Sequence, residues 1–457
     1  MAGGVNLSAR VLRRRRWRAG SPVHNWARNQ ACVPADVAFP TSIDEVSSVV
    51  AAARDAGRRV RVIGAAHSFT AAAMTDGVLV CLDDMADVIE VDREQCRVRV
   101  QAGITLRALS LRLDAEGLAL ENLGDIDVQS LAGAIATGTH GTGAAFGGLA
   151  TQVEELTLVD GCGEVRTLDA ASTPEEFAVS RVSLGALGVV CEVVLRCVPA
   201  FRLHARETIE PLDDLLSDVA GFAASADHAE FFWMPGARRC KVKRNTRTDA
   251  PPRPQGRVGY VRDKIIAENL AFGVVCRVGR RWPALAPRIA RLVSSSVSER
   301  ELVDVSHRVF ASPRHVRFVE MEYGIPLEHL DAAMAEVRGV TASLSFPALF
   351  PVEVRVSAAD DIALSPGFGR ANAWVAVHQY RGAPFEAYFQ RVAQVMDAYD
   401  GRPHWGKMHF SSAADLASRY PLWDRFAEVR SRFDPDGVFR NEYVDRVLGP
   451  VRGEPTP

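Results

Sequence analysis

The stretch RRVRVIGAAHSFT, residues Arg58–Thr70, joins a short β-like run to a turn of small residues that ends at a histidine. The β-branched run Val60–Ile63 favours a strand, and Gly64 interrupts it. His67 follows at once. Taken alone, His67 fits two interpretations: a histidine hydrogen-bonded to nearby backbone, or a ligand-facing residue on a turn that admits a ligand. The rest of the chain decides between them.

The size and composition of the chain predict a folded protein of two domains. The chain has 457 residues, 47% of them hydrophobic and 24% charged, which is too long for one ordinary core and too apolar for general disorder. The net charge of -2 argues against a general nucleic-acid binder, because such proteins usually have a basic excess. We therefore expect no nucleic-acid partner.

The N-terminal segment contains the one strongly basic cluster, VLRRRRWR. AGSPVHNWARNQ follows it in place of the apolar core of a signal peptide, so a flexible basic arm is predicted over residues 1–29. The eight cysteines form no CxxC pair, and several lie in apolar runs, which indicates free thiols in a reducing compartment. No apolar run is long enough to span a membrane. We expect a soluble cytoplasmic protein and leave peripheral contact with the inner face of the plasma membrane open.

Residues 36–201 show the pattern of an α+β unit. Ser42 and Glu45 form a capping box before an apolar stripe that ends at Gly57, which predicts a helix. Strands are expected at GVLVCL, VIEVD and RVRVQAG, a helix at 106–116, and two strands around the Asp-Gly turn of EELTLVDGCGEVRTLD.

Residues 202–400 mix amphipathic segments with strands at RFVEMEYGIP, PVEVRVS and AWVAVHQY. This alternation predicts a sheet with helices on one face and the other face free for a ligand. The Pro- and Arg-rich segment Thr246–Arg257 is expected to be a mobile loop.

The most glycine-rich segment is SLAGAIATGTHGTG, residues Ser130–Gly143. Its small side chains let backbone N–H groups and threonine hydroxyls approach a pyrophosphate. It is not a Walker loop, and the strand, GxGxxG and distal acid of a Rossmann site are missing. A tightly packed turn is the alternative. Together with the turns VIGAAHSF and SLGALGVV, the segment favours a dinucleotide bound by some other fold.

PVEVRVS alternates apolar and charged residues, as a strand with two different faces does. Glu353 and Arg355 are expected on one face, opposite the valines. An exposed ion pair on an edge strand would show the same pattern and contribute little. WVAVHQY also alternates, with Ala376, His378 and Tyr380 on one side. Two such strands predict a sheet that lines a polar pocket.

The segment RPHWGKMHF contains Lys407, one of only four lysines in the chain. A compact ammonium suits a place where a point charge meets a developing anion. A surface loop is the alternative.

Taken in order from about residue 25 to 449, a series of segments resembles the vanillyl-alcohol-oxidase superfamily of FAD enzymes, and within it the aldonolactone oxidoreductases. The segments are NWARNQACVP, VRVIGAAHSFTAAAMTDGVLV, LENLGDIDVQSLAGAIATGTHGTG, RVSLGALGVV, VRFVEMEYGIP, PVEVRVSA, VAVHQY, RPHWGKMHF and FDPDGVFRNEY. The resemblance implies a two-domain α+β fold of the PCMH type, with a sheet-plus-helix substrate (cap) domain. The expected divisions are an FAD-binding domain at 30–201, the cap at 202–400, a segment returning to the flavin at 401–449, and a tail at 450–457.

The resemblance gives His67 a role, because in this family the histidine of the GxxHS turn is commonly joined through a ring nitrogen to the 8α-methyl of the flavin. His67 is therefore expected to anchor FAD covalently. Ala65 and Ala66 replace glycines of the common GGGHS form; alanine is small enough that we expect FAD to bind, and we expect the backbone there to avoid positive φ. No metal site is expected. The other expected cofactor contacts are Ile63, Gly64, Ser68, Gly124, Ser130, Gly133, Ala136, Thr137, Gly138, Thr139, His140, Gly141, Thr142, Gly188 and Val189.

The resemblance also implies a reaction: oxidation of the C2 hydroxyl of an aldono-1,4-lactone, L-gulono- or D-arabinono-1,4-lactone, with hydride transfer to flavin N5, in an ascorbate-like biosynthesis. Glu353 would accept hydrogen bonds and perform proton transfer, and Arg355 would bind the lactone oxygens. His378, Tyr380 and Asp125 would complete the pocket, and Lys407 would lie near flavin N1 and C2=O.

The electron acceptor stays open between O2 and a cytochrome- or quinone-type acceptor. In relatives, a small residue in the NLGD region influences access of oxygen to the flavin, and Gly124 fits the permissive form. Two alternatives remain: an alditol oxidase of the same fold, and a flavin-binding protein without catalysis of its own.

Overall fold

The strand and turn of the stretch Arg58–Thr70 belong to a small parallel sheet near the N-terminus. The computed structural model describes residues 17–256, 272–282, 299–314 and 316–451. The helix α1, Ile43–Asp55, begins where the Ser42 side chain accepts a hydrogen bond from the Glu45 N–H, as the capping box predicts. The sheet has the order β3–β5–β4, with β3 at Asp36–Ala38, β5 at Val78–Cys81 and β4 at Val60–Ile63.

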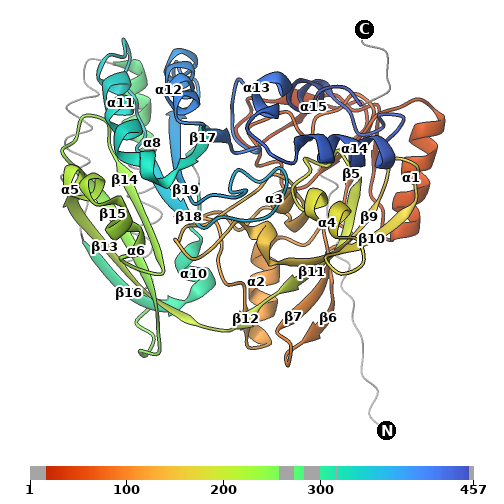
Figure 1. Ribbon diagram of the computed structural model, residues 1–457, viewed down its shortest axis with the longest axis horizontal. Coiled ribbons are helices and arrows are strands. Elements are labelled where there is room, and N and C mark those ends of the chain that lie inside the picture. Colours follow the sequence, from red (N-terminus) through yellow and green to blue (C-terminus); the bar gives the residue numbers. More distant parts are fainter. Residues whose placement is uncertain (1–16, 257–271, 283–298, 315, 452–457) are drawn as a thin grey trace.

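An antiparallel sheet of five strands completes the first unit of the fold (Figure 1). In the central strand, β11, every second residue is buried against the helices of this unit, and its β-branched sequence favours such a strand. In spatial order the strands are β10 (Val165–Asp169), β9 (Val153–Val159), β11 (Val189–Arg196), β7 (Arg97–Gln101) and β6 (Val88–Asp92). The helices are α2 (Leu106–Ala115), α3 (Leu131–Ala136), the 3-10 helix η1 (Leu149–Gln152) and α4 (Pro174–Ser180). Two short pairs accompany them: β1 (Val23–His24) with β2 (Ala31–Cys32), and β8 (Leu118–Ala119) with β12 (Val198–Pro199).

The second unit is built on an antiparallel sheet of eight strands that begins at Arg202. PVEVRVS forms β18 in the middle of this sheet, so the edge-strand alternative for Glu353 and Arg355 is wrong. In spatial order the strands are β16 (Arg300–Val305), β13 (Arg202–Pro211), β15 (Arg239–Thr248), β14 (His228–Trp233), β18 (Val352–Ser357), β19 (Asn372–Tyr380), β17 (Phe318–Pro326) and β20 (Arg402–Pro403).

Helices cover one face of the eight-stranded sheet and leave the other toward the first unit (Figure 1). Val352, Val354 and Val356 of β18 pack against these helices with Val375 and Val377 of β19, as their alternation predicts. The opposite face therefore presents the ionisable residues. The helices on this apolar face are α5 (Leu212–Ser217), α6 (Val219–Ala224), η4 (Leu327–His329), α11 (Leu330–Ala342) and α12 (Glu386–Ala398). Two other helices of this unit, α8 (Phe272–Arg281) and α10 (Ser306–Phe310), contribute to other apolar clusters.

The C-terminal segment packs on the first unit. Its helices are α13 (Ala413–Ala417), α14 (Trp423–Phe433) and α15 (Glu442–Leu448). Phe426 and Val444 join the same apolar core as α2 and β11. The Val438 carbonyl accepts a hydrogen bond from the Val60 N–H of β4 at 2.8 Å, so the end of the chain borders the turn that holds His67.

Two sequence-based expectations differ from the structure. Residues 17–29, predicted to belong to a flexible arm, are fixed: Trp17 is buried, and Asn25 donates a hydrogen bond to the Ser68 carbonyl at 2.9 Å. Most of the arginine run lies outside the described residues. The predicted mobile loop Thr246–Arg257 begins inside β15, and Arg253 forms a bridge with Val303, because backbone pairing with neighbouring strands outweighs the Pro-rich composition.

All eight cysteines are free, as predicted. Within the described ranges, none of the helices combines the length and the apolar composition that crossing a membrane requires.

Candidate active site

The polar face of the large sheet forms a regular grid over β17, β19 and β18. His378 on β19 lies opposite Glu320 on β17. In the next row, Ala376 lies between Glu322 on β17 and Glu353 on β18. Because residues two apart share a face, the small Ala376 is surrounded by carboxylates and an imidazole. The two-residue alternation predicted the positions of Glu353 and His378 on this face.

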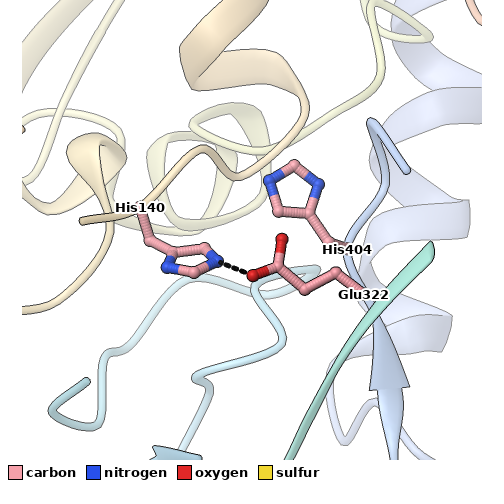
Figure 2. Close-up of side chains that lie close together, drawn as sticks. All are labelled: His140, Glu322 and His404. Carbon is pink, nitrogen blue, oxygen red and sulfur yellow. Dashed lines mark ion pairs between the residues drawn. The ribbon is translucent and has the colours of Figure 1, made fainter. Parts of the chain in front are cut away.

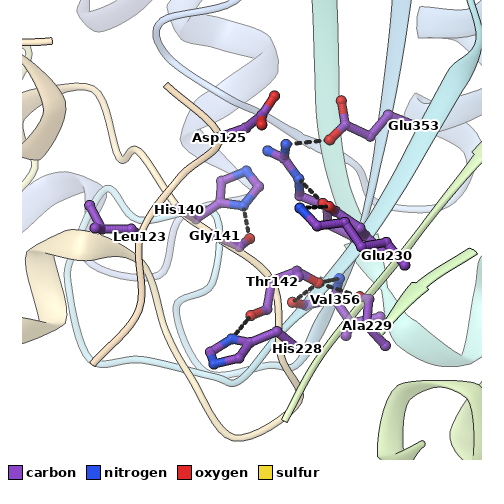
Figure 3. A network of polar contacts seen from close by, with 12 residues as sticks. Leu123, Asp125, His140, Gly141, Thr142, His228, Ala229, Glu230, Glu353 and Val356 are labelled. Carbon is purple, nitrogen blue, oxygen red and sulfur yellow. Dashed lines mark hydrogen bonds and ion pairs between the residues drawn. The ribbon is translucent and has the colours of Figure 1, made fainter. Parts of the chain in front are cut away.

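Glu353 and Arg355 form a buried ion pair with a second acid, Glu230 of β14 (Figure 3). The Nε–H of Arg355 donates to Glu230 at 3.1 Å, and a terminal nitrogen contacts Glu353. Burial raises the pKa of Glu353 to about 7; the Arg355 cation opposes this, and the charges of Glu230 and Asp125 add to it. Glu353 can therefore exchange a proton near neutral pH.

Asp125, which the family resemblance placed in the substrate pocket, lies close to this pair (Figure 3). Its carboxylate pairs with Arg314, and its carbonyl accepts a hydrogen bond from the Ser312 N–H at 3.0 Å. Burial raises the pKa of Asp125, but the Arg314 and Arg355 cations outweigh burial and lower it overall. Asp125 stays ionised and adds negative charge beside Arg355.

Glu320, which the sequence analysis did not single out, joins His378 to Lys407. One carboxylate oxygen lies 2.5 Å from Lys407 Nζ and the other 3.4 Å from His378 Nε2. His378 donates from Nδ1 to the Pro351 carbonyl at 3.1 Å, which turns Nε2 toward Glu320 and, at 3.9 Å, toward Glu353. Burial opposes ionisation of Glu320, but Lys407 and His378 lower its pKa to about 2. His378 thus faces one firmly ionised carboxylate and one that titrates near neutrality.

His140, Glu322 and His404 form a second buried cluster (Figure 2). His140 donates from Nδ1 to the Gly141 carbonyl, directs Nε2 to Glu322 at 3.3 Å, and stacks on Trp374 at 3.7 Å between ring centroids. Burial lowers the pKa of His404 to about 3, so it is neutral, and its Nδ1 accepts from the Gly406 N–H. The other ring nitrogen of His404 therefore carries the proton. Because neither His404 nitrogen has a free lone pair, the cluster suits a hydrogen-bond network better than a metal ion.

A cavity that is partly open to solvent lies in the first unit beside the turn after β4. Its walls come from the turn after β4, from α3 and from the loop before β11. The predicted cofactor residues that line it are Ile63, Gly64, Ala65, Ala66, His67, Ser68, Ser130, Gly133, Ala136, Thr137 and Gly188.

The walls of this cavity fit a dinucleotide that needs close approach of two backbone segments. A Cβ at Gly64 would lie 1.9 Å from Ser130 Oγ, so only glycine lets the two walls meet. The expectation that the backbone at Ala66 avoids positive φ is wrong, since φ there is 58°. The Ala66 carbonyl accepts a hydrogen bond from the Trp26 N–H at 2.7 Å, which helps to hold this strained conformation.

His67 lies in the wall of the cavity, where its ring stacks on Trp26 with centroids 5.4 Å apart. The next residues connect the cavity to the polar sheet face: the Phe69 N–H donates to the Gly406 carbonyl at 2.7 Å, and Lys407 Nζ lies 5.3 Å from the Phe69 ring centroid. Phe318 packs against both Phe69 and His378. The His67 end of the cavity is therefore adjacent to the grid of ionisable residues.

Several predicted site residues lie elsewhere. Thr142 docks on the large sheet, where its hydroxyl donates to the Ala229 carbonyl at 2.5 Å (Figure 3). Tyr380 stands at the end of β19, with the Arg280 guanidinium carbon 5.7 Å from its ring centroid. The expected cofactor contacts that do not line the cavity are Gly124, Gly138, Thr139, His140, Gly141, Thr142 and Val189.

Among the residues that the sequence analysis missed, Glu320 and Glu322 had a readable signal. The strand FVEMEYGIP alternates as PVEVRVS does, with both glutamates on the face opposite Val319 and Met321. Glu230 had a weaker signal: Ala229, Phe231 and Trp233 of its strand HAEFFW alternate with His228 and Glu230, but Phe232 interrupts the polar face.

Two family models match this chain. The model described as D-arabinono-1,4-lactone oxidase matches residues 193–447, and the one described as FAD binding domain matches residues 34–169. The first covers the large sheet and the second covers the turn of His67 and the helix α3.

Known proteins align with nearly the whole chain. L-gulono-1,4-lactone dehydrogenase of Mycobacterium tuberculosis is 44% identical, over 94% of this chain and 100% of its own length. L-gulonolactone oxidase of Bos taurus is 34% identical, over 94% of this chain and 98% of its own length. Alditol oxidase of Streptomyces sp. is also 34% identical, over 93% of this chain and 99% of its own length.

A solved structure shares the fold. A solvent-stable cholesterol oxidase superimposes with a TM-score of 0.78 at 20% identity, over 94% of this chain and 97% of its own. Together with the FAD-binding match, this likeness confirms the predicted two-domain FAD-binding fold.

Proposed function

Because the chain belongs to the D-arabinono-1,4-lactone oxidase family, whose model matches more than half of its residues, we propose that the protein is an FAD-dependent oxidoreductase acting on an aldono-1,4-lactone. The substrate loses a hydride from C2 and the proton of the C2 hydroxyl group, and it becomes the 2-keto lactone. The chemistry that FAD supplies when bound is acceptance of that hydride at N5.

One observation carries this proposal: the ionisable grid adjoins the His67 end of the cavity. Small, backbone-rich walls suit a dinucleotide, and the grid suits a polyhydroxylated substrate. Oxidation of an alcohol needs a proton acceptor and a cation for the oxygen that develops charge. Glu353 and Arg355 lie together in that grid.

Three residues of the grid have a task in this proposal. Arg355, held by Glu230 and Glu353, binds the lactone oxygens and stabilises charge on the reacting oxygen. Glu353 takes the hydroxyl proton, since its pKa of about 7 suits a base at neutral pH. His378 Nε2, between Glu353 and Glu320, donates to or accepts from a substrate hydroxyl.

The direct test of the proposal is anaerobic reduction of the purified flavoprotein by a candidate substrate, which is measured as the loss of flavin absorbance. L-gulono-1,4-lactone and D-arabinono-1,4-lactone are expected to bleach the flavin in single turnovers, and xylitol is expected to do so far more slowly. Bleaching by xylitol alone would indicate the alditol oxidase alternative. No bleaching by any of the three, in a protein that contains FAD, would contradict the proposed reaction.

We further propose that His67 attaches FAD covalently. Its position in the cavity wall, with its ring fixed against Trp26, supports this role. After acid precipitation, the yellow colour is expected to stay in the redissolved pellet of the parent protein and to be absent from the pellet of His67→Ala. His24→Ala, at a largely exposed histidine, is the matched control and is expected to keep the colour. Colour released to the supernatant from the parent protein would reduce His67 to a non-covalent contact.

For the acceptor, we propose that Gly124, which packs on the backbone of His140 beside the ionisable grid, controls the access of O2 to the active site. A Cβ at this position would lie 3.1 Å from the His140 carbonyl oxygen, so an alanine narrows the space there. Gly124→Ala is expected to slow reoxidation by O2 several-fold and to leave reoxidation by an artificial dye unchanged. The measurement is stopped-flow reoxidation with each acceptor.

Gly339→Ala is the control for Gly124→Ala, since a Cβ on Gly339 of α11 would meet open space. Equal rates with O2 for Gly124→Ala and the parent would exclude control of oxygen by this residue.

A further inference from the structure

Arg61 on β4 is a buried cation that the proposed reaction does not use. Arg61 is 3% exposed to solvent, and it belongs to the residues that line the cofactor cavity. Its guanidinium donates to four backbone carbonyls: Nε to Ala72 at 2.7 Å, Nη1 to Gly185 at 3.1 Å and to Phe439 at 2.7 Å, and Nη2 to Leu184 at 2.5 Å. Of its five N–H donors, these bonds use four.

The charge of Arg61 lacks a matching carboxylate. Among the described residues, none forms an ion pair with it; all four acceptors are neutral carbonyls. Burial and the nearby cation of Arg430 lower the pKa of Arg61 to about 10, so it remains charged at neutral pH. A buried charge without an opposite charge is costly, and such a charge at a cavity wall suits an anionic ligand.

The acids that influence Arg61 are already engaged. Asp434 accepts hydrogen bonds from the Val438 and Phe439 N–H groups, and burial raises its pKa to about 6. Asp445 pairs with Arg440 at 2.8 Å. Neither replaces an anion inside the cavity.

The same guanidinium ties together three chain segments around the cavity. Leu184 and Gly185 both adopt positive φ, 53° and 64°, and both carbonyls accept from Arg61. Phe439 brings the C-terminal segment to the same side chain. Arg61 therefore holds a strained turn of the cavity wall, and its guanidinium lies against the wall residues Leu184 and Gly185.

We propose that Arg61 is a binding residue for the diphosphate of FAD, supplying a buried counter-charge in the cavity wall. This inference rests on the proposed function, because it takes FAD as the ligand. The diphosphate is the anionic part of FAD, and β4 leads directly into the turn of Gly64 to Ser68 that lines the same cavity. The four carbonyl bonds orient the guanidinium before the ligand arrives, so little side-chain entropy is lost on binding.

The experiment uses the full chain carrying His67→Ala, so that flavin binding is reversible. Dissociation constants for FAD and for riboflavin, which lacks the diphosphate, are measured by flavin fluorescence. Adding Arg61→Met is expected to weaken FAD binding about tenfold to a hundredfold, the effect of one charged hydrogen bond, and to leave riboflavin binding unchanged. Adding Arg61→Lys, which keeps the charge, is expected to recover part of the FAD affinity.

Arg402→Met is the control, because Arg402 is another buried arginine that donates to backbone carbonyls, those of Pro366 and Phe368, and it does not line the cavity. It is expected to leave both dissociation constants unchanged. Equal losses of FAD and riboflavin affinity in Arg61→Met would overturn the proposal that Arg61 is a counter-charge for the diphosphate, and would show that it acts only by holding the cavity wall. Unchanged FAD affinity in both Arg61→Met and Arg61→Lys would also overturn the proposal. Failure of the His67→Ala chain and the parent to bind FAD at all would instead contradict the proposed function. If Arg61→Met does not fold, the FAD dissociation constant of Arg61→Gln is measured at a series of salt concentrations. A weaker dependence on salt than in the His67→Ala chain supports the counter-charge, and an equal dependence overturns it.

Discussion

Replacing Glu353 with glutamine is expected to slow reduction of the bound flavin by a lactone by about 10² to 10⁴, the usual contribution of a positioned general base. Glutamine keeps the size and the hydrogen bonding of the side chain but cannot accept the proton. The contacts of Arg355 with Glu230 remain available, so lactone affinity is expected to fall much less than the reduction rate. Stopped-flow reduction at a series of lactone concentrations separates the two effects.

The pH dependence gives an independent signature of Glu353. Its pKa is raised to about 7, and a base acts when it is deprotonated, so the reduction rate of the parent protein is expected to rise with pH through about 7 and then level off. Glu353→Gln is expected to lose this rise. A rise that persists unchanged in the variant would assign the titration to another group.

Stability is expected to change in the opposite direction to activity. The folded state binds the Glu353 proton more tightly than the unfolded chain does, because its pKa is raised from 4.5 to about 7. The free energy of unfolding contributed by this group is therefore fully present below pH 4.5 and is lost as pH rises through 7. Glutamine is uncharged at any pH, so at pH 8 the variant is expected to melt no lower than the parent, as thermal unfolding would show.

Glu207→Gln is the matched control for Glu353→Gln. Glu207 also lies on the large sheet and pairs with Lys241 at 2.7 Å, but β15 and β14 separate its strand from β18. In Glu207→Gln, a lactone is expected to reduce the bound flavin at the same rate as in the parent protein. Parent-like reduction by Glu353→Gln as well would remove Glu353 from the role of base.

Alternation explains which part of this site could be predicted from the sequence. A period of two places residues on a face without any knowledge of the partner strands, and so it located Glu353, Arg355 and His378. The same rule applied to FVEMEYGIP would have located Glu320 and Glu322. The order of the strands is a different matter, because pairing of β14 with β18 joins residues 125 positions apart. Glu230 therefore became a partner of Arg355 only in the structure.

The glycine-rich segment shows the limit of composition as evidence. Its small residues indicated a close approach of backbone, and that holds at Gly133, which lines the cavity. At Thr142 the close approach is to the large sheet instead, where Val356 and Ala229 bond its hydroxyl. Small residues permit either contact, so only the tertiary arrangement distinguishes a ligand from a neighbouring domain. Arg61 was missed because one arginine in a strand has no pattern around it.

Replacing Lys407 with methionine is expected to slow flavin reduction by about 10² to 10³, the usual effect of removing one preorganised electrostatic contact. Lys407 Nζ lies 2.5 Å from Glu320 and 5.3 Å from the Phe69 ring centroid, at the junction of the grid with the cavity. Without the Lys407 ammonium, the reduced flavin, on which negative charge develops during the reaction, is expected to lose a nearby cation. The reduction potential of the bound flavin is therefore expected to fall, as a dye-equilibration titration would show.

A second variant separates the charge of Lys407 from the effect of leaving Glu320 unpaired. Burial opposes ionisation of Glu320, so removal of Lys407 raises the pKa of Glu320 and disturbs His378. The double variant Lys407→Met with Glu320→Gln removes both ends of the pair. If the cation itself matters, the double variant stays as slow as Lys407→Met; if the unpaired carboxylate causes the loss, the double variant recovers most of the rate and Lys407 is a positioning residue. Lys241→Met, which removes another paired lysine of the same sheet, is expected to leave both the rate and the potential unchanged.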